Sequence, residues 1–188
     1  GTLLNERNLG LWKDKGLNTV ALSCVSHHDE INSRMLSGGE IRWHLSNAVR
    51  TSRDIGLLVR LTVILTKGGI ENRDSFLAFL DWAKSAGAHQ LTFRMMGEPR
   101  NLSLPGSLDV ANWIRAHKIE PNFILEELSK TGREQDPLPW AQVFTWDGLS
   151  IVVTEHMNAP KDGVVRHAII QPDGHLYGSW DDPGNILI

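Results

Sequence analysis

The chain has 188 residues, 41% of them hydrophobic and 22% charged, which suits one globular domain or one domain with an appendage. Its net charge of −3 and its scattered basic residues argue against nucleic-acid or membrane binding through bulk charge. No apolar stretch is long enough to span a bilayer. The single cysteine, Cys24, excludes an intrachain disulfide and favours a reducing, cytoplasmic location.

The first half of the chain predicts alternating helices and strands. In chain order, these are a helix over 5–15, a strand over 19–25, a helix over 40–51, a strand over 57–66, a helix over 73–85 and a strand over 90–95. Gly/Pro-rich residues 97–106 then form a loop, and helices are predicted over 109–117 and 122–130. This alternation is typical of a parallel sheet with connecting helices.

The character of the sequence changes after Pro139. Asp147-Gly148 separates two strand-like runs and favours a type I′ hairpin. Pro172-Asp173-Gly174 separates a second pair, over 165–171 and 175–180. We therefore divide the chain into a partial barrel over 1–138 and a C-terminal β extension over 139–188.

In the three predicted strands of the first half, the polar residues occupy alternate positions. Because strand side chains alternate between faces, these residues can share one face while the apolar residues take the other. The polar set is Ser23, Arg60, Thr62, Thr66, Thr92 and Arg94. A packed barrel interior is filled with branched apolar residues, so a polar one predicts ligand binding. The predicted fold class is α/β: a partial parallel (β/α) barrel with a C-terminal antiparallel β appendage.

Several segments of the first half resemble the radical S-adenosylmethionine (radical SAM) superfamily core, from the end of its third barrel strand onward. The segments are Gly1-Thr2-Leu3-Leu4, residues 11–17, Val20-Ala21-Leu22-Ser23, residues 59–68 and residues 91–96. Residues 166–177 resemble, more loosely, a C-terminal β unit of some members. The family holds a [4Fe–4S] cluster on a CxxxCxxC motif, which a chain with one cysteine lacks. The resemblance thus implies that three βα units, on the order of 90 residues, are missing.

The resemblance implies a binding site for S-adenosylmethionine and substrate inside the part-barrel. Its expected residues are Ser23, Arg60, Thr62, Arg94 and Met96. Ala21 and Ser23 replace the Ser and Asp of the commoner family pattern. The [4Fe–4S] cluster is expected only with the missing N-terminal segment or a partner chain, so we expect this chain alone to be inactive. The substrate is expected to be a small molecule or a peptide.

Other readings of the same residues stay open. The polar face could be a self-satisfied network, and the chain could be a non-catalytic module that binds a small anion or docks to a partner through an open sheet edge. A hydrolase or aldolase barrel would need a catalytic lysine or carboxylate pair, for which the sequence offers no convincing candidate.

Histidines and the cysteine give weaker signals. Residues 27–29, His-His-Asp, follow a strand where barrel active sites lie, but a solvated loop is the simpler interpretation. His156, His167 and His175 match no zinc spacing. Cys24 has apolar neighbours and is expected to be buried rather than nucleophilic.

Overall fold

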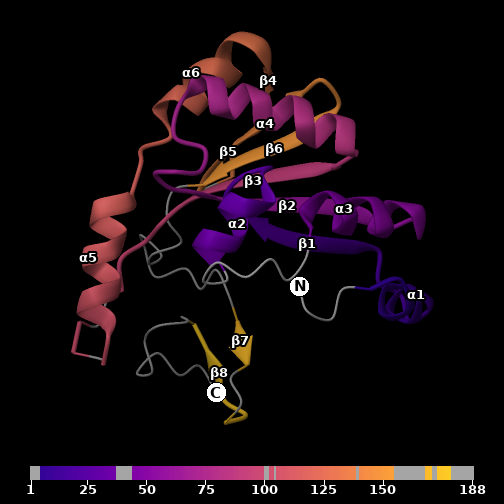
Figure 1. The fold of residues 1–188 in the computed structure, drawn as a ribbon, viewed down its shortest axis with the longest axis horizontal. Helices are drawn as coiled ribbons and strands as arrows, with labels where there is room; N and C mark the ends of the chain where they lie inside the picture. The colour runs from indigo at the N-terminus through magenta and orange to yellow at the C-terminus, as the bar shows by residue number, and fades with distance from the viewer. Residues whose placement is uncertain are drawn as a thin grey trace. The chain divides into compact units, whose positions relative to one another are not determined.

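A computed structural model gives the fold of the chain (Figure 1). It describes residues 5–36, 44–99, 102–103, 105–138, 140–154, 168–170 and 173–178. The chain separates into two compact units. Unit 1 comprises Gly1–Met96 and Lys118–Glu155, and unit 2 comprises Gly97–His117 and His156–Ile188.

Unit 1 is built on a six-stranded sheet with the order β1-β2-β3-β6-β5-β4. The strands are β1 (Thr19–Cys24), β2 (Leu58–Leu65), β3 (Gln90–Met95), β6 (Leu149–Thr154), β5 (Ala141–Trp146) and β4 (Arg133–Glu134). The first four in this order are mutually parallel, β5 pairs antiparallel with β6, and β4 pairs antiparallel with β5. The α/β class with parallel strands is therefore confirmed. Among the described residues the sheet has two edges, β1 and β4, and does not close.

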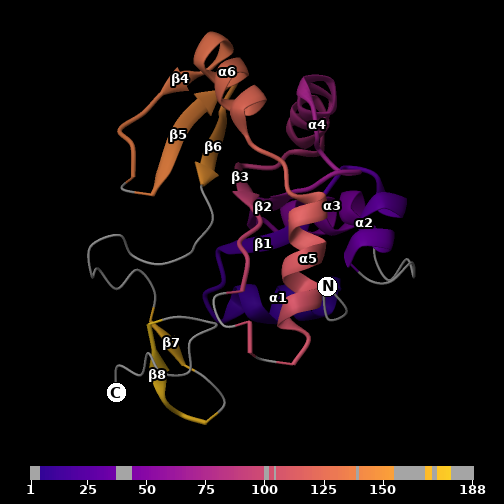
Figure 2. The same ribbon diagram turned by 90° about the vertical axis from the view of Figure 1, so that its left-hand side faces the viewer.

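The helices of unit 1 are α1 (Glu6–Asp14), α2 (Asp29–Leu36), α3 (Leu45–Asp54), α4 (Arg73–Ala86) and α6 (Asn122–Thr131). Helix α3 packs on β1 and β2, and α6 packs on α4 and β5. Figure 2 shows α3 and α4 on the same side of the β1–β2–β3 part of the sheet. Helix α4 begins at the Asn72 capping box and ends at Gly87, whose φ of 83° suits glycine.

Strand periodicity explains which face these helices cover. One row across the sheet consists of Leu22, Leu61, Leu91 and Ile151, which pair in register and are all buried. Phe76 and Phe79 of α4 pack edge-on against Phe93 of β3, with ring centroids 5.3 and 6.0 Å apart. The alternate apolar side chains of each strand thus pack against the helices and form the core.

The hairpin at Asp147-Gly148 forms as predicted, with both residues at positive φ. Its place differs from the expected appendage, because β6 joins the main sheet and pairs in parallel with β3. The reason is the apolar row Leu149, Ile151 and Val153, all buried in the common core. Helix α2 was not expected, since the sequence there reads as a polar loop.

Unit 2 contains α5 (Ser107–His117) and a two-stranded antiparallel sheet of β7 (Ile169–Ile170) and β8 (Leu176–Tyr177). Asp173 accepts a hydrogen bond from the Tyr177 hydroxyl at 2.6 Å, which fixes the turn before β8. The remaining residues of the second predicted strand pair, His167 among them, lie outside the described residues, as does His156. Among the residues that the structure covers, every helix is too short or too polar to cross a membrane.

Candidate functional site

The sheet face opposite α3 and α4 carries the predicted polar residues. Ser23, Thr62 and Thr92 are register partners on β1, β2 and β3, so their side chains form one row across three strands. Arg94 lies two residues after Thr92, the register partner of Thr62, so Thr62 and Arg94 share this face, as predicted. Ser23 is exposed, and Thr62 and Thr92 are half-buried. The row presents three hydroxyls that can donate and accept hydrogen bonds.

Two guanidinium groups flank the hydroxyl row. On one side, Arg60 donates from Nε to Oε1 of Gln90 at 2.8 Å and is exposed. On the other side, toward the carboxyl ends of the strands, Arg94 pairs in register with Ile64 and Thr154. At the usual strand rise, the four residues from Arg60 to Ile64 span about 13 Å. The structure therefore places the two charges at separate ends of the face.

Arg94 is the more unusual of the two arginines. It is half-buried, and its Nε is enclosed without a hydrogen-bond partner among the described residues. A buried N–H without an acceptor costs free energy, so native structures rarely leave one unpaired. Such a group is suited to an acceptor that arrives with a ligand.

The polar face carries no described carboxylate that could neutralise these arginines. Its positions on β1, β2, β3 and β6 are Thr19, Ala21, Ser23, Leu58, Arg60, Thr62, Ile64, Gln90, Thr92, Arg94, Ser150, Val152 and Thr154. The face is thus cationic although the whole chain carries a net charge of −3. Arginine binds carboxylates and phosphates with two parallel hydrogen bonds, so anionic groups suit this face.

Two other predicted residues lie at the strand ends. Met96 directly follows β3 and is half-buried. Thr66 follows β2, is buried, and its hydroxyl lies 3.4 Å from the Lys67 carbonyl. Thr66 is therefore part of the turn into α4 rather than of the exposed hydroxyl row.

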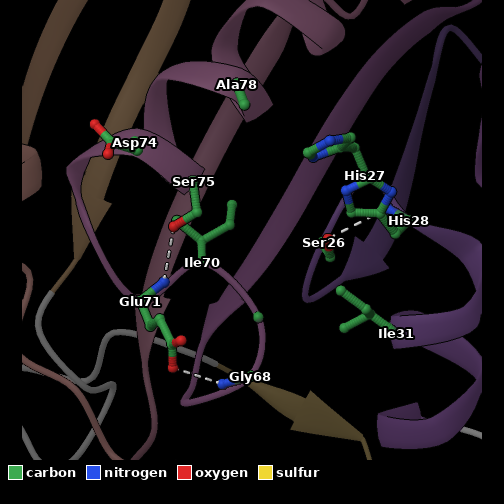
Figure 3. A pocket seen from close by; sticks show the side chains of 11 residues that line it. Ser26, His27, His28, Ile31, Gly68, Ile70, Glu71, Asp74, Ser75 and Ala78 are labelled. Atoms are coloured by element: carbon green, nitrogen blue, oxygen red, sulfur yellow. Dashed lines mark hydrogen bonds between the residues drawn. The ribbon is translucent and has the colours of Figure 1, made fainter.

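A pocket of about 450 Å³ opens at the carboxyl ends of β1 and β2. It lies between the loop from Ser26 to His28 and the loop from Gly68 to Glu71, with α2 and α4 contributing further walls. Figure 3 shows the two histidines facing Ile70, Glu71 and Ser75 across this space. The sequence alone indicates a solvated loop at the histidines, because only the parallel pairing of β1 and β2 brings the two loops together.

Both loops are held by their own hydrogen bonds. The buried Asn32 side chain accepts from the backbone N–H groups of Val25 (2.9 Å) and Ser26 (3.2 Å) and donates to the Ser26 carbonyl (2.8 Å). In the second loop the Gly68 N–H donates to Oε2 of Glu71 at 2.8 Å. The walls of the pocket are therefore preformed.

His27 is the inner histidine of the pair. Its ring lies 3.9 Å from that of His28 and stacks on Trp82 with centroids 6.0 Å apart. Its Nδ1 is enclosed and has no partner among the described residues. Burial, and secondarily the neighbouring His28, lower the pKa of His27, so its ring is neutral near pH 7.

The described residues bring together no group of three metal-ligating side chains. Cys24 is buried in the core, as predicted, and burial raises the pKa of its thiol to about 12. His175 lies beside Asp173 in unit 2, with Nδ1 3.6 Å from Oδ2. These side chains therefore form no nucleophilic or metal centre in the described part of the chain.

Comparison with known proteins gives no match to any protein-family model and no significant match to a curated protein.

Proposed function

We propose that this chain is the later portion of a radical SAM enzyme and that its polar sheet face binds S-adenosylmethionine and substrate. The observation that carries the proposal is the cationic, hydroxyl-lined face on parallel strands, opposite the face on which the connecting helices α3 and α4 pack. Arg94 would bind an anionic group of the ligand, and Thr62 and Ser23 would hydrogen-bond its hydroxyls. The sequence resemblance supplies the identity of the ligand.

The topology supports a part-barrel as the finer description of the fold. Strands β1, β2 and β3 are adjacent in chain order, and α3 and α4 connect them on one side of the sheet. A doubly wound sheet would place helices on both faces. In a barrel, the face opposite the connecting helices becomes the interior, and here the face opposite α3 and α4 is the polar one. We place such a protein in the cytoplasm, where an oxygen-sensitive cluster is kept reduced.

The free edge of β1 is where the remaining strands would join. The Leu58 N–H donates to the Asn18 carbonyl, so alternation directs the backbone groups of Thr19, Ala21 and Ser23 away from β2. β1 carries no charged residue and no proline, whereas the other edge, β4, is only the pair Arg133–Glu134. An uncharged regular edge suits pairing with another strand. The missing N-terminal segment or a partner chain would supply that strand and the cluster.

Calorimetric titration with S-adenosylmethionine tests the proposal. We expect binding by the wild-type chain, and losses of about tenfold for Arg94→Gln and Thr62→Val, each of which removes a hydrogen bond to the ligand. Arg50→Gln, on the exposed surface of α3, is the matched control and leaves affinity unchanged. Absence of binding, alone and after joining to cluster-bearing N-terminal units, contradicts the proposal.

The inactivity of the isolated chain is a separate part of the proposal. Cys24 is the single cysteine and is buried, so treatment with iron and sulfide should give no [4Fe–4S] absorbance. A reducible cluster on the 188-residue polypeptide would refute this part.

Binding of a small anion without catalysis is the second candidate, because the face pairs two guanidinium groups with no described carboxylate. Inorganic phosphate distinguishes the candidates. A simple anion module binds phosphate as tightly as S-adenosylmethionine and loses both on Arg94→Gln.

A further inference from the structure

The pocket between the two loops is a second site, separate from the polar sheet face. It is lined from α2 and α4, on the side of the sheet that the helices cover, whereas Arg94 and Thr62 lie on the opposite face. Its lining residues are Ser26, His27, His28, Ile31, Gly68, Gly69, Ile70, Glu71, Asp74, Ser75 and Ala78.

The construction of the pocket indicates a binding site rather than a random surface hollow. Asn32, itself buried, holds the first loop with three hydrogen bonds. In the second loop, a Cβ on Gly69 would lie 2.6 Å from the Val25 carbonyl oxygen, so glycine permits the two loops to touch. The stacking of His27 on Trp82 then sets the direction of its ring. Each wall is fixed before any ligand arrives, which lowers the cost of binding.

The charges of the lining select the ligand class. Glu71 uses Oε2 to accept the Gly68 N–H, and its Oε1 has no partner within the described residues. Asp74 adds a second carboxylate at the rim, where its side chain points outward in Figure 3. The described residues that line the pocket include no lysine or arginine; the Arg34 guanidinium lies near Gly68, outside the lining. With His27 neutral, the lining attracts a cation.

The remaining lining fits an aliphatic group. Ile31 of α2 and Ala78 of α4 give the pocket its accessible apolar surface, whereas Ile70, 1% exposed, belongs to the core behind it. A cation with a short hydrocarbon stem can bury the stem here and bring its charge to Oε1 of Glu71. A hydrated metal ion would gain nothing from these apolar walls, and no three-ligand group is present among the described residues.

We propose that this pocket binds a primary alkylammonium group, with the nitrogen donating to Glu71 and the stem packed against Ile31 and Ala78. The group can come from a lysine side chain of a polypeptide or from a small free diamine. The inference stands without S-adenosylmethionine binding, because the two sites use different residues on opposite faces.

Titration of the 188-residue chain, followed through the ring proton signals of His27 and His28, tests the proposal. The probes are Nα-acetyl-lysine-N-methylamide, its Nε-acetylated form, and 1,5-diaminopentane. We expect saturable shifts with the charged lysine derivative and none with the acetylated form, which keeps the stem but loses the charge. Tighter binding of the lysine derivative than of the diamine identifies a peptide source, and the reverse order identifies a free amine.

Variants separate the carboxylate from general surface charge. Glu71→Gln keeps an acceptor for the Gly68 N–H but removes the charge, and we expect affinity for the amine to fall about threefold. Glu126→Gln, on the exposed side of α6, is the matched control and leaves it unchanged. Equal binding of the acetylated probe, or equal affinities of the two variants, overturns the proposal. Unchanged amide spectra show that each variant is folded, and omission of S-adenosylmethionine keeps the result independent of the proposed function.

Discussion

Replacement of Asn32 by alanine is the sharpest test of how the pocket is held. The change removes the acceptor of the Val25 and Ser26 N–H groups and the donor to the Ser26 carbonyl. Val25 and Ser26 are 2% and 3% exposed, so water has little access to the freed groups. Because each buried group left unsatisfied costs about 1–3 kcal/mol and the loop can relax, we expect a total loss of about 3 kcal/mol.

Thermal and urea unfolding followed by circular dichroism measure this loss. For a chain of this length, about 3 kcal/mol corresponds to a decrease in Tm of about 6–12 °C. The His27 and His28 ring signals should shift in the same variant, because their loop loses its anchor. Asn47→Ala is the matched control: Asn47 is exposed on α3, so its replacement should change stability by less than about 0.5 kcal/mol. A loss for Asn32→Ala below about 1 kcal/mol, or unchanged histidine signals, would refute the reasoning.

Three further predictions concern single residues. Cys24 should resist thiol reagents at pH 8 in the folded protein and react after denaturation, since burial raises its pKa to about 12; rapid labelling of the native chain would contradict this. His27 has a pKa below its ordinary 6.5, so its contribution to stability is present above pH 6.5 and is lost as the pH falls below that value. The urea concentration at the unfolding midpoint should accordingly decrease as the pH is lowered from 7 to 5, and it should decrease less in His27→Gln. An equal decrease in the wild type and in His27→Gln would show that His27 is not responsible. Gly69→Ala should destabilise by about 1–3 kcal/mol through its contact with the Val25 carbonyl. Gly10→Ala is the control: a Cβ added at Gly10 in α1 has nothing within 4 Å, so this change should raise the free energy of unfolding by up to about 1 kcal/mol. Equal effects of Gly69→Ala and Gly10→Ala in urea titrations would contradict the contact between the loops.

Where one face of a strand is buried, the sequence correctly predicts the strand and the face on which each of its side chains lies. Alternation alone places Thr62 and Arg94 on one side, and the register of β2 with β3 bears this out. The Asp147-Gly148 turn likewise predicts its own hairpin, because the turn residues act locally.

The sequence does not predict long-range partners. Nothing in the residues of β6 specifies parallel pairing with β3, so the sequence alone predicts the hairpin as part of an appendage. The pocket was missed for the same reason, since His28 and Glu71 meet only when β1 and β2 align. Helix α2 was missed because its polar first turn, with Asp29 accepting from the Leu45 N–H, depends on a contact with α3.

The most direct test of the account is a methyl-resolved NMR titration with S-adenosylmethionine. We expect shifts at the methyl groups of Thr62, Ile64 and Thr92, which lie on the polar face, and little change at Leu61 and Val63 on the core face. Absence of any shift, or shifts confined to the core face or to the pocket, would contradict binding at the polar face.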